Sequence, residues 1–326
     1  METLSHHIFH IQSEADFAGT ALQVFRFQYA ENAVYRAYCQ YLKVEEQRVE
    51  SLNDIPFLPI SFFKTHEVKT TDFIPELTFR SSGTTGMQYS RHLIKNAQLY
   101  RQSLLNSFRF FYGEPSEYTI LALLPNYLEQ KNSSLVYMME VLMHESGAAD
   151  NGYYLYNHEE LYQKLIELRD NQQKVILWGV TFALLDFAEH YPIDFPQLIV
   201  FETGGMKGRR KEMVKEELYD ILRKAFDVSE IHSEYGMCEL LSQAYSKGGN
   251  LFTTPSWMQL RLRNEKDPLD RSDSVSTGVI NVIDLANLYS CSFIATEDLG
   301  RRHPQGIEIL GRLDHSQLRG CNLMVL

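Results

Sequence analysis

The sequence contains little cysteine and no long apolar run. Its 326 residues include four cysteines, Cys39, Cys238, Cys291 and Cys321, and their positions lack the spacing of a metal site. Such sparse cysteine is typical of a protein of the reducing cytoplasm. No stretch approaches the ~20 apolar residues of a membrane span, and the N-terminus does not look like a signal peptide. We therefore expect neither a disulfide framework nor a membrane span.

Positive charge is also in short supply. The chain has 31 Lys and Arg residues against 42 Asp and Glu residues, which gives a formal net charge of −11. This balance argues against a broad surface for nucleic acid or for an anionic membrane. The hydrophobic share of 44% is ample for a buried core. The length suits one large domain or two smaller ones.

Two common catalytic motifs are absent. A Walker A loop needs Lys and then Ser or Thr after its last glycine, but Met87 and Gln88 follow Gly86. A Gly-x-Ser-x-Gly elbow is not recognisable either, which argues against a serine acyltransferase that uses a preformed acyl donor.

A stretch rich in hydroxyl residues and glycine lies between two predicted strands. Thr78–Arg80 is predicted to be the strand before this stretch. Polar and apolar residues alternate over Gln88–Ile94, which predicts a strand after it. Small hydroxyl side chains and unhindered backbone N–H groups are what a polyphosphate-binding loop needs. An ordinary hairpin turn is the alternative. The residues concerned are Ser81, Ser82, Gly83, Thr84, Thr85 and Gly86.

The apolar periodicity predicts a layered α/β core, because short buried strands alternate with helices. One long helix is expected over Ala15–Val44. The other predicted helices are Lys95–Phe111, Ser134–Glu145, Glu159–Asp170, Phe182–His190 and Arg209–Phe226. The predicted strands are Tyr118–Leu124, Val175–Trp178, Leu198–Phe201, Gln259–Arg263, Gly278–Ile283, Ser292–Ala295 and Ile307–Leu310.

A glycine turn follows the predicted strand Leu198–Phe201. Gly204 and Gly205 come at its carboxyl end, just before a basic helix. Such a turn is where α/β folds place ligands. A tight strand-to-helix turn without a ligand is the alternative reading.

The loop at Ser81–Gly86 resembles the phosphate loop of adenylate-forming enzymes, the group of acyl-CoA ligases and luciferases. Three further matches follow in the order of that family. The first is the segment from Tyr235 and Gly236 to Glu239, which is similar to the family motif Tyr-Gly-x-Thr-Glu. The resemblance implies that Glu239 holds Mg²⁺ on the phosphates of ATP. Cys238 stands where that family has a threonine that touches the phosphate.

The other matches concern the nucleoside. The resemblance implies that Asp298 binds both ribose hydroxyls and that Arg312 also contacts the ribose. It implies that Gly204 and Gly205 flank the adenine, and that ATP and Mg²⁺ are the cofactors. The implied architecture is a large domain at residues 1–310, with a β-rich part at about 256–310, and a hinge segment at 311–326. Other members continue for roughly a hundred residues beyond the hinge, with a lysine that contacts the reacting carboxylate. We expect that domain to be missing here.

A narrower family is similar over most of the chain, namely the acyl-protein synthetase component of the bacterial luciferase fatty-acid reductase. In that family a cysteine near the C-terminus takes the acyl group as a thioester, and Cys321 stands at the matching place. Without the resemblance, Cys321 is better explained as a small apolar residue of a terminal strand. Lys64 and Lys207 match lysines of this family without an assigned role. The alternative interpretation of Lys64 is a solvated residue at the end of the apolar stretch Asp54–Lys64.

The predicted function is therefore ATP-dependent, AMP-forming activation of a carboxylic acid, in particular a fatty acid. Transfer to Cys321 and delivery to a partner reductase or another acceptor would follow. One alternative is an acyl-CoA ligase that releases the acyl group to coenzyme A. A second is a non-catalytic adenylate-binding subunit.

Overall fold

The computed structural model describes residues 2–81, 89–125, 132–204 and 213–313. Its contacts divide the chain into two compact units. Unit 1 combines Met1–Phe73 with Ser256–Leu326, and unit 2 is Ile74–Pro255. The expected division at residue 310 stays a prediction. No helix of the described part is long and apolar enough to cross a membrane.

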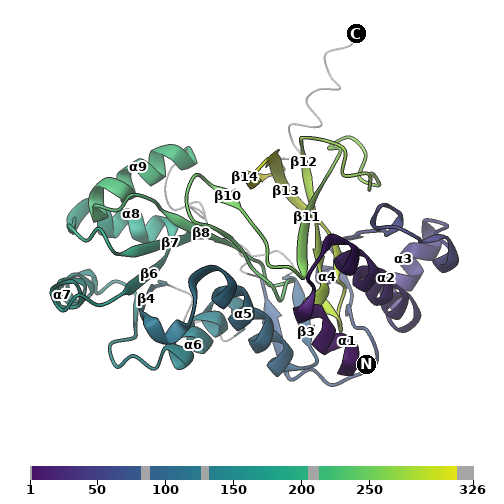
Figure 1. The fold of residues 1–326 in the computed structure, drawn as a ribbon, viewed down its shortest axis with the longest axis horizontal. Helices are drawn as coiled ribbons and strands as arrows, with labels where there is room; N and C mark the ends of the chain where they lie inside the picture. Colours follow the sequence, from purple (N-terminus) through teal and green to yellow (C-terminus); the bar gives the residue numbers. More distant parts are fainter. Residues whose placement is uncertain (1, 82–88, 126–131, 205–212, 314–326) are drawn as a thin grey trace, which may run out of the picture. The chain divides into compact units, whose positions relative to one another are not determined.

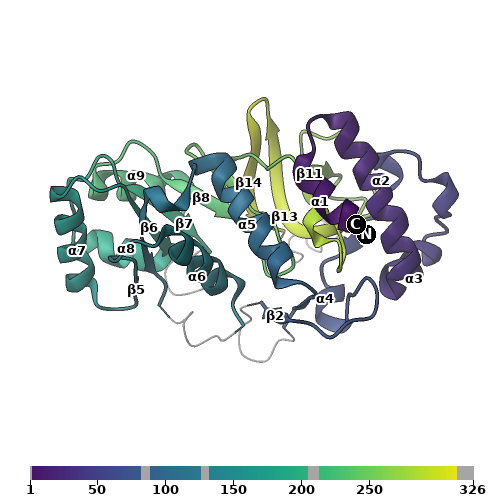
Figure 2. The same cartoon turned by 60° about the horizontal axis from the view of Figure 1, so that its bottom comes forward.

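Unit 2 is built on a mostly parallel sheet in the order β5-β4-β6-β7-β8-β9, with only β9 antiparallel (Figure 1). Strands β4 and β6 are buried along their whole length, as the continuous apolar runs predicted. Helices α5 and α6 cover one face of the sheet, and α7, α8 and α9 cover the other (Figure 2). The parallel strands are β4 (Thr119–Leu123), β5 (Gly152–Tyr154), β6 (Val175–Val180), β7 (Ile199–Thr203) and β8 (His232–Tyr235), and the chain continues with β9 (Ala244–Ser246) and β10 (Leu251–Phe252).

The helices of unit 2 confirm the predicted ones, with shifted ends. Helix α5 begins at Ala97 because Asn96 caps it, accepting a hydrogen bond from the backbone N–H of Leu99 at 3.1 Å. The predicted helix Arg209–Phe226 is wrong at its start. Val214 is extended and the helix begins at Lys215, while residues 205–212 lie outside the described part. The helices are α5 (Ala97–Tyr112), α6 (Ser134–Ser146), α7 (His158–Asp170), α8 (Thr181–His190) and α9 (Lys215–Phe226), with a 3-10 turn at Pro115–Glu117.

Unit 1 centres on an antiparallel sheet in which β14, β13, β12 and β11 are successive neighbours. These strands confirm the four strands predicted between residues 259 and 310, with shifted ends. The short strand β1 (Leu58–Pro59) pairs in parallel with β13 at Ile294 and Ala295. The strands are β11 (Met258–Arg263), β12 (Thr277–Asp284), β13 (Phe293–His303) and β14 (Gly306–Arg312).

The single helix predicted over Ala15–Val44 is two helices, α2 (Glu14–Glu31) and α3 (Ala33–Tyr41). Asn32 separates them with an extended backbone, and its side chain accepts a hydrogen bond from the N–H of Tyr35 as the cap of α3. Asn32 is fully buried and also donates to the carbonyl of Ser290 at 2.7 Å. The tertiary bond therefore favours a break that apolar spacing does not reveal. The shorter helices of unit 1 are α1 (Glu2–His7) and α4 (Phe62–Thr65), with 3-10 turns at Ile8–His10, Glu46–Arg48, Leu52–Asp54 and Leu285–Asn287.

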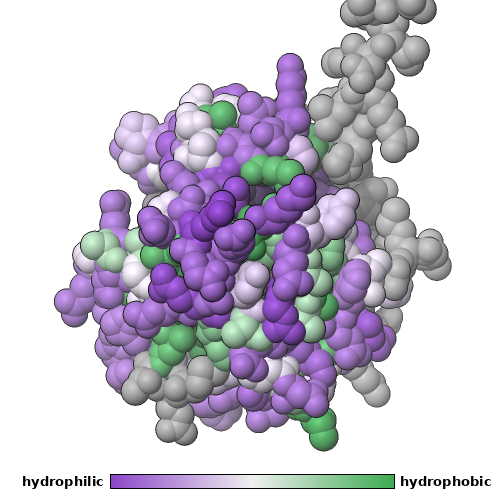
Figure 3. Space-filling model, turned by 90° about the vertical axis from the view of Figure 1, so that its right-hand side faces the viewer, coloured by the Kyte–Doolittle hydropathy of each residue, from purple (hydrophilic) through white to green (hydrophobic). Residues whose placement is uncertain are grey.

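Gln28 of α2 holds the chain that connects β12 to β13. Its amide nitrogen donates to the carbonyls of Asn287 at 3.0 Å and Leu288 at 3.1 Å, and its amide oxygen accepts from the N–H of Ser292 at 2.9 Å. Next to this network, Phe293 packs against Phe25 and Tyr35. The side of unit 1 that carries α2 and α3 is mostly hydrophilic, with hydrophobic side chains scattered over it (Figure 3).

We predict that Gln28→Ala lowers the free energy of unfolding by about 2–4 kcal/mol, because several buried backbone groups lose their partner. Urea unfolding measures the change. Gln23→Ala is the matched control, since Gln23 is exposed on the same helix. An equal, small effect of both substitutions would contradict the structural role of Gln28.

Candidate active site

The candidate phosphate loop leaves and re-enters a two-stranded hairpin in unit 2. Strands β2 (Leu77–Arg80) and β3 (Arg91–Ile94) pair antiparallel, with Arg80 opposite Arg91. The predicted strands on either side of the loop are thus confirmed, although β3 begins at Arg91. Ser81 and Ser90 close the neck of the hairpin, because Ser90 N–H donates to Ser81 Oγ at 3.0 Å and Ser81 N–H donates to the Ser90 carbonyl at 3.2 Å. The remaining loop candidates, Ser82, Gly83, Thr84, Thr85 and Gly86, lie outside the described residues.

The segment Tyr235–Glu239 leaves the carboxyl end of β8. Glu239 is 5% exposed and Cys238 is 7% exposed. Burial, and then the neighbouring Glu239 carboxylate, raise the pKa of the Cys238 thiol well above its ordinary value. The thiol is therefore neutral. Cys238 supplies no hydroxyl at this position.

His92 connects the hairpin to this segment. Its Nδ1 lies 2.8 Å from the carbonyl oxygen of Cys238, and the side chain is 1% exposed. Because a carbonyl only accepts, Nδ1 carries the proton. Burial lowers the pKa of His92 to about 4, so the ring is neutral near pH 7. The structure uses His92 in this buried hydrogen bond.

Gly204 directly follows β7 with φ +84°, a conformation that side chains disfavour. The turn that the sequence predicts at the carboxyl end of this strand is thus present at Gly204. Gly205 and Lys207 lie outside the described residues. Since β7 and β8 are parallel neighbours, Gly204 and Gly236 leave the sheet at the same edge.

Two glutamates at this edge were missed by sequence reasoning. Glu202 is 2% exposed and accepts from Lys215 Nζ at 3.1 Å and from Thr181 Oγ1. Glu234 is half-buried and accepts from Thr203 Oγ1 at 3.1 Å. Burial, and to a lesser degree the charge of Glu202, raise the pKa of Glu234 to about 7, against the hydrogen bond from Thr203. The only sequence signal was that Glu234 directly precedes Tyr235 in the second motif.

In unit 1, the two ribose candidates are cross-strand partners. Asp298 of β13 stands opposite Arg312 of β14, and Arg312 Nε lies 3.7 Å from Asp298 Oδ1. The Asp298 side chain is 18% exposed and that of Arg312 is 75% exposed. Asp298 N–H also donates to Thr296 Oγ1 at 3.1 Å. A carboxylate and a guanidinium separated by 14 residues in sequence are thus brought together by one hairpin.

Lys64 belongs to the same unit as this pair. It lies on α4, which follows β1, and the N–H of Ile60 donates to the Ala295 carbonyl at 2.9 Å. Strands β12 and β14 occupy opposite edges of β13, and β1 lies on the edge shared with β14. Strands β1 and β13 run parallel, with Pro59 opposite Ala295. Lys64 comes after Pro59 and Asp298 comes after Ala295, so both chains continue toward the same end of the sheet. The half-buried Lys64 amine is a candidate cation.

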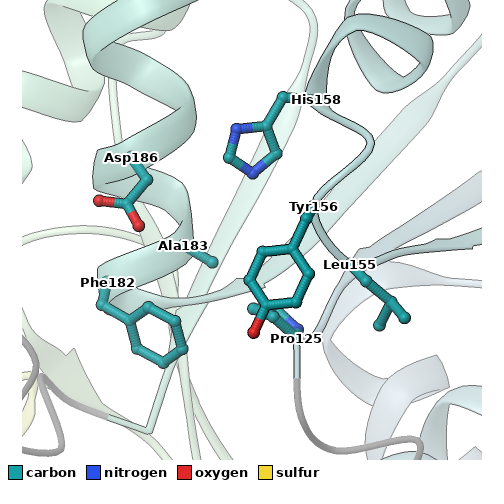
Figure 4. Close-up of a pocket in the computed structure, with 7 residues that line it drawn as sticks. All are labelled: Pro125, Leu155, Tyr156, His158, Phe182, Ala183 and Asp186. Atoms are coloured by element: carbon teal, nitrogen blue, oxygen red, sulfur yellow. The ribbon is translucent and has the colours of Figure 1, made fainter.

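A pocket of about 350 Å³ opens at the carboxyl ends of β4, β5 and β6 in unit 2. Figure 4 shows His158 and Asp186 at one end and the rings of Tyr156 and Phe182 at the other. Because α8 begins directly after β6, Phe182 lies at the edge of the sheet and Asp186 lies one helical turn further back. The lining residues are Pro125, Leu155, Tyr156, His158, Phe182, Ala183 and Asp186.

Comparison with known proteins fits this arrangement. The family model of the acyl-protein synthetase LuxE matches residues 10–326. The chain belongs to the LuxE acyl-protein synthetase family. A LuxE-family relative from Vibrio harveyi, named long-chain-fatty-acid–luciferin-component ligase, is 24% identical over 92% of this chain and 84% of its own length. The family assignment thus covers both units.

Solved structures show the fold that this LuxE-family chain shares. The open conformation of 2-hydroxyisobutyryl-CoA ligase matches with a TM-score of 0.62 at 14% identity, over 94% of this chain and 72% of that one. The fatty acyl-adenylate ligase from L. pneumophila matches with a TM-score of 0.52 at 14% identity, over 76% of this chain and 52% of that one. The chain therefore spans about half the length of the latter enzyme. The α/β fold expected for the large domain of adenylate-forming enzymes is confirmed.

We predict a pH effect from Glu234. Since the folded state raises its pKa from 4.5 to about 7, the folded protein binds more protons than the unfolded chain between these values. The Glu234 contribution to the free energy of unfolding therefore falls as pH rises through this window. Glu234→Gln should remove that decline in urea unfolding series. The control is Glu217→Gln, which changes an exposed glutamate of α9. Parallel pH profiles of wild type and Glu234→Gln would contradict the prediction.

Proposed function

We propose that this protein activates a carboxylic acid, of the fatty class, with ATP to form an acyl-adenylate and pyrophosphate. The observation that carries the proposal is membership of the LuxE acyl-protein synthetase family over residues 10–326. The Vibrio harveyi relative is named a long-chain-fatty-acid ligase. In the proposed step, a carboxylate oxygen attacks the α-phosphorus of ATP, the bond from that phosphorus to the bridging oxygen breaks, and pyrophosphate leaves.

The phosphates would be bound by residues of unit 2. The loop Ser81–Gly86 would donate hydroxyl and backbone hydrogen bonds, and Gly204 and Gly205 would flank the adenine. Tyr235 and Gly236 would contact the nucleotide at the neighbouring strand end. These roles follow from the motif matches, and the confirmed hairpin and strand-end positions support them.

Glu239 would hold Mg²⁺ together with the phosphates of ATP. Within the described part of the chain, no group of three or more His, Cys, Asp or Glu residues is arranged to bind a metal ion. One protein carboxylate completed by substrate phosphates is a common way to bind Mg²⁺, so the donor set fits. When bound, the ion would neutralise charge on the phosphates during pyrophosphate departure.

The ribose would be bound by Asp298 and Arg312. Ribose hydroxyls are donors, and an ionised carboxylate accepts from both of them. Arg312 lies beside Asp298 and keeps a largely exposed guanidinium that can reach a ligand. The body of the acid would enter the pocket between Tyr156 and Phe182, which lies at the edge of the sheet where β7 and β8 also end.

After adenylate formation, we propose that the acyl group moves to Cys321. The thiolate would attack the acyl carbonyl carbon, the bond from that carbon to the adenylate oxygen would break, and AMP would leave. Burial raises the pKa of Cys39 to about 12, and it raises the pKa values of Cys238 and Cys291 further. All three thiols are buried and poorly nucleophilic. Cys321 lies outside the described residues.

The cation that contacts the reacting carboxylate is proposed to be Lys64 or Lys207. A partner reductase, or another acceptor, would then take the acyl group from Cys321. Release of the adenylate to coenzyme A is the alternative outcome, and analysis of the thioester product distinguishes the two.

The first test is exchange of labelled pyrophosphate into ATP across fatty, aromatic and amino acids. We expect acid-dependent exchange. Asp298→Asn should raise the KM for ATP roughly 10- to 100-fold, since charged hydrogen bonds to the ribose are lost. Glu308→Gln is the matched control, because Glu308 is a carboxylate of the same hairpin that pairs with Arg301 and His303. Wild-type protein that neither catalyses exchange nor binds AMP would end the proposal.

The second test follows covalent labelling by a radioactive fatty acid with ATP. We expect wild-type protein to acquire a label that hydroxylamine releases, as it does from a thioester. Cys321→Ala should lose the label while exchange continues. Cys39→Ala is the control and should retain the label. Continued labelling of Cys321→Ala would show that another group accepts the acyl chain.

A further inference from the structure

A second cavity, of about 80 Å³, lies within unit 1. One side is formed by α3 and the segment that follows it, and the other by the loop between β11 and β12. That loop is exposed at Pro268 and Leu269, so a ligand can enter from the surface of the unit. Most of the lining is apolar, namely Leu42, Val44, Pro56, Phe57, Pro268 and Leu269.

The polar side chains of the lining supply hydrogen-bond donors. Arg271 donates through Nη1 to the carbonyl of Asp54 at 2.6 Å, and its other N–H groups have no partner within the described part of the chain. Asn281 is 2% exposed, and its Oδ1 accepts from Nη1 of Arg263 at 3.0 Å. The amide nitrogen of Asn281 is therefore left as a donor to the cavity.

Tyr38 of α3 adds a neutral hydroxyl. Burial, and then the thiols of Cys39 and Cys291, raise the pKa of Tyr38 to about 12, against the charges of Arg263 and Arg271. The hydroxyl therefore keeps its proton near pH 7 and can donate it in a hydrogen bond. It makes no hydrogen bond to any residue that the structure describes.

Asp270 is a carboxylate of the lining, but its own loop satisfies it. Its Oδ1 accepts from the N–H of Ser272 at 3.0 Å and from the Ser272 hydroxyl at 2.7 Å. Its Oδ2 accepts from the N–H of Asn264 at 2.9 Å. Asp270 therefore shapes the loop, and its oxygens are not paired with Arg271.

Positive charge beside the cavity is not balanced by ion pairs. Arg261 and Arg263 of β11 are 7% and 8% exposed, and Arg261 is the cross-strand partner of Asn281. These two guanidinium groups and that of Arg271 donate to carbonyl and amide oxygens. Within residues 2–81, 89–125, 132–204 and 213–313, none of the three forms an ion pair with a carboxylate. Because burial of an unpaired charge is costly, an anion in the cavity would stabilise this arrangement.

The size of the cavity limits the anion. One water needs ~10–15 Å³, so a cavity of about 80 Å³ has space for roughly five to eight non-hydrogen atoms. Donors at one end and apolar side chains over the rest favour a charged head with a short hydrocarbon body. Butyrate falls within this range.

We propose that this cavity is a binding site for a short alkyl carboxylate of butyrate size. The carboxylate would accept from Arg271, Asn281 and Tyr38, and the alkyl chain would pack against Phe57 and Leu269. The site is separate from the ribose candidates, since side chains alternate along β13. Ala295 pairs with Asn281, so Asp298 faces the opposite side of the sheet.

The test is calorimetric titration of the full-length protein with sodium butyrate in the absence of ATP. We expect saturable binding with a Kd of about 1 mM. Acetate should bind about tenfold more weakly, because it lacks two methylene groups that the apolar wall would cover. Butyramide should bind at least roughly tenfold more weakly, because it has no charge to pair with Arg271.

Two variants locate the binding. Arg271→Gln should weaken butyrate binding at least roughly tenfold, because the cation is lost. Leu269→Trp should also abolish it, by filling the entrance from an exposed position that a folded protein tolerates. The matched control is Arg301→Gln, which removes a half-exposed arginine of the same unit that pairs with Glu308. This control should bind butyrate as the wild type does.

Competing anions separate the other sources of a signal. Octanoate is too long for the cavity and should not displace butyrate, whereas displacement by octanoate would assign the signal to the proposed fatty-acid pocket. Inorganic phosphate that competes as strongly as butyrate would show that charge alone is recognised. Either result would overturn the proposal, and so would the absence of saturable binding up to about 50 mM.

Unchanged butyrate binding in folded Arg271→Gln or Leu269→Trp protein would overturn the proposal as well. The measurement involves neither ATP nor pyrophosphate exchange, so its result does not depend on the function proposed above.

Discussion

The structure depends above all on the common edge at which the parallel strands of unit 2 end. Strands β4, β6, β7 and β8 run in the same direction, so the residues that follow them gather at this edge whatever their separation in sequence. Gly204, Gly236, the buried Glu202 and the half-buried Glu234 are brought together in this way. Neighbouring strands lie only ~4.8 Å apart. A nucleotide-sized ligand therefore meets several strand ends at once.

In unit 1, the position of the candidate ribose-binding pair depends on how strand β13 is held in place. The long strand β13 places Asp298 opposite Arg312, and a displaced β13 would separate them. Gln28 and Asn32 hold the chain before β13 by buried hydrogen bonds, and Phe293 packs into the aromatic cluster of α2 and α3. Buried polar side chains thus fix the chain that leads into β13, while the pairing of β13 with β14 sets Asp298 opposite Arg312.

The sequence predicted the parts of the fold that depend on local pattern. Continuous apolar runs located β4, β6 and β7. The roles of Gly204, Glu239, Asp298 and Arg312, which come from motif matches, stay predictions. It did not predict the break at Asn32, because that break is favoured by a hydrogen bond to Ser290, 258 residues away. Glu234 was missed for the same reason, since its surroundings, such as Thr203 on the neighbouring strand, are distant in sequence. The roles of Cys321 and Lys207, which lie outside the described residues, stay predictions.

The central claim is that a carboxylate oxygen attacks the α-phosphorus of ATP. It is tested most directly by supplying an acid whose carboxylate carries ¹⁸O and analysing the nucleotide after the acyl group has passed to a thiol. The account predicts AMP that contains one ¹⁸O from the acid, because the carbon–oxygen bond breaks when the thiol attacks. Unlabelled AMP, or ADP with ¹⁸O in released phosphate, would contradict it.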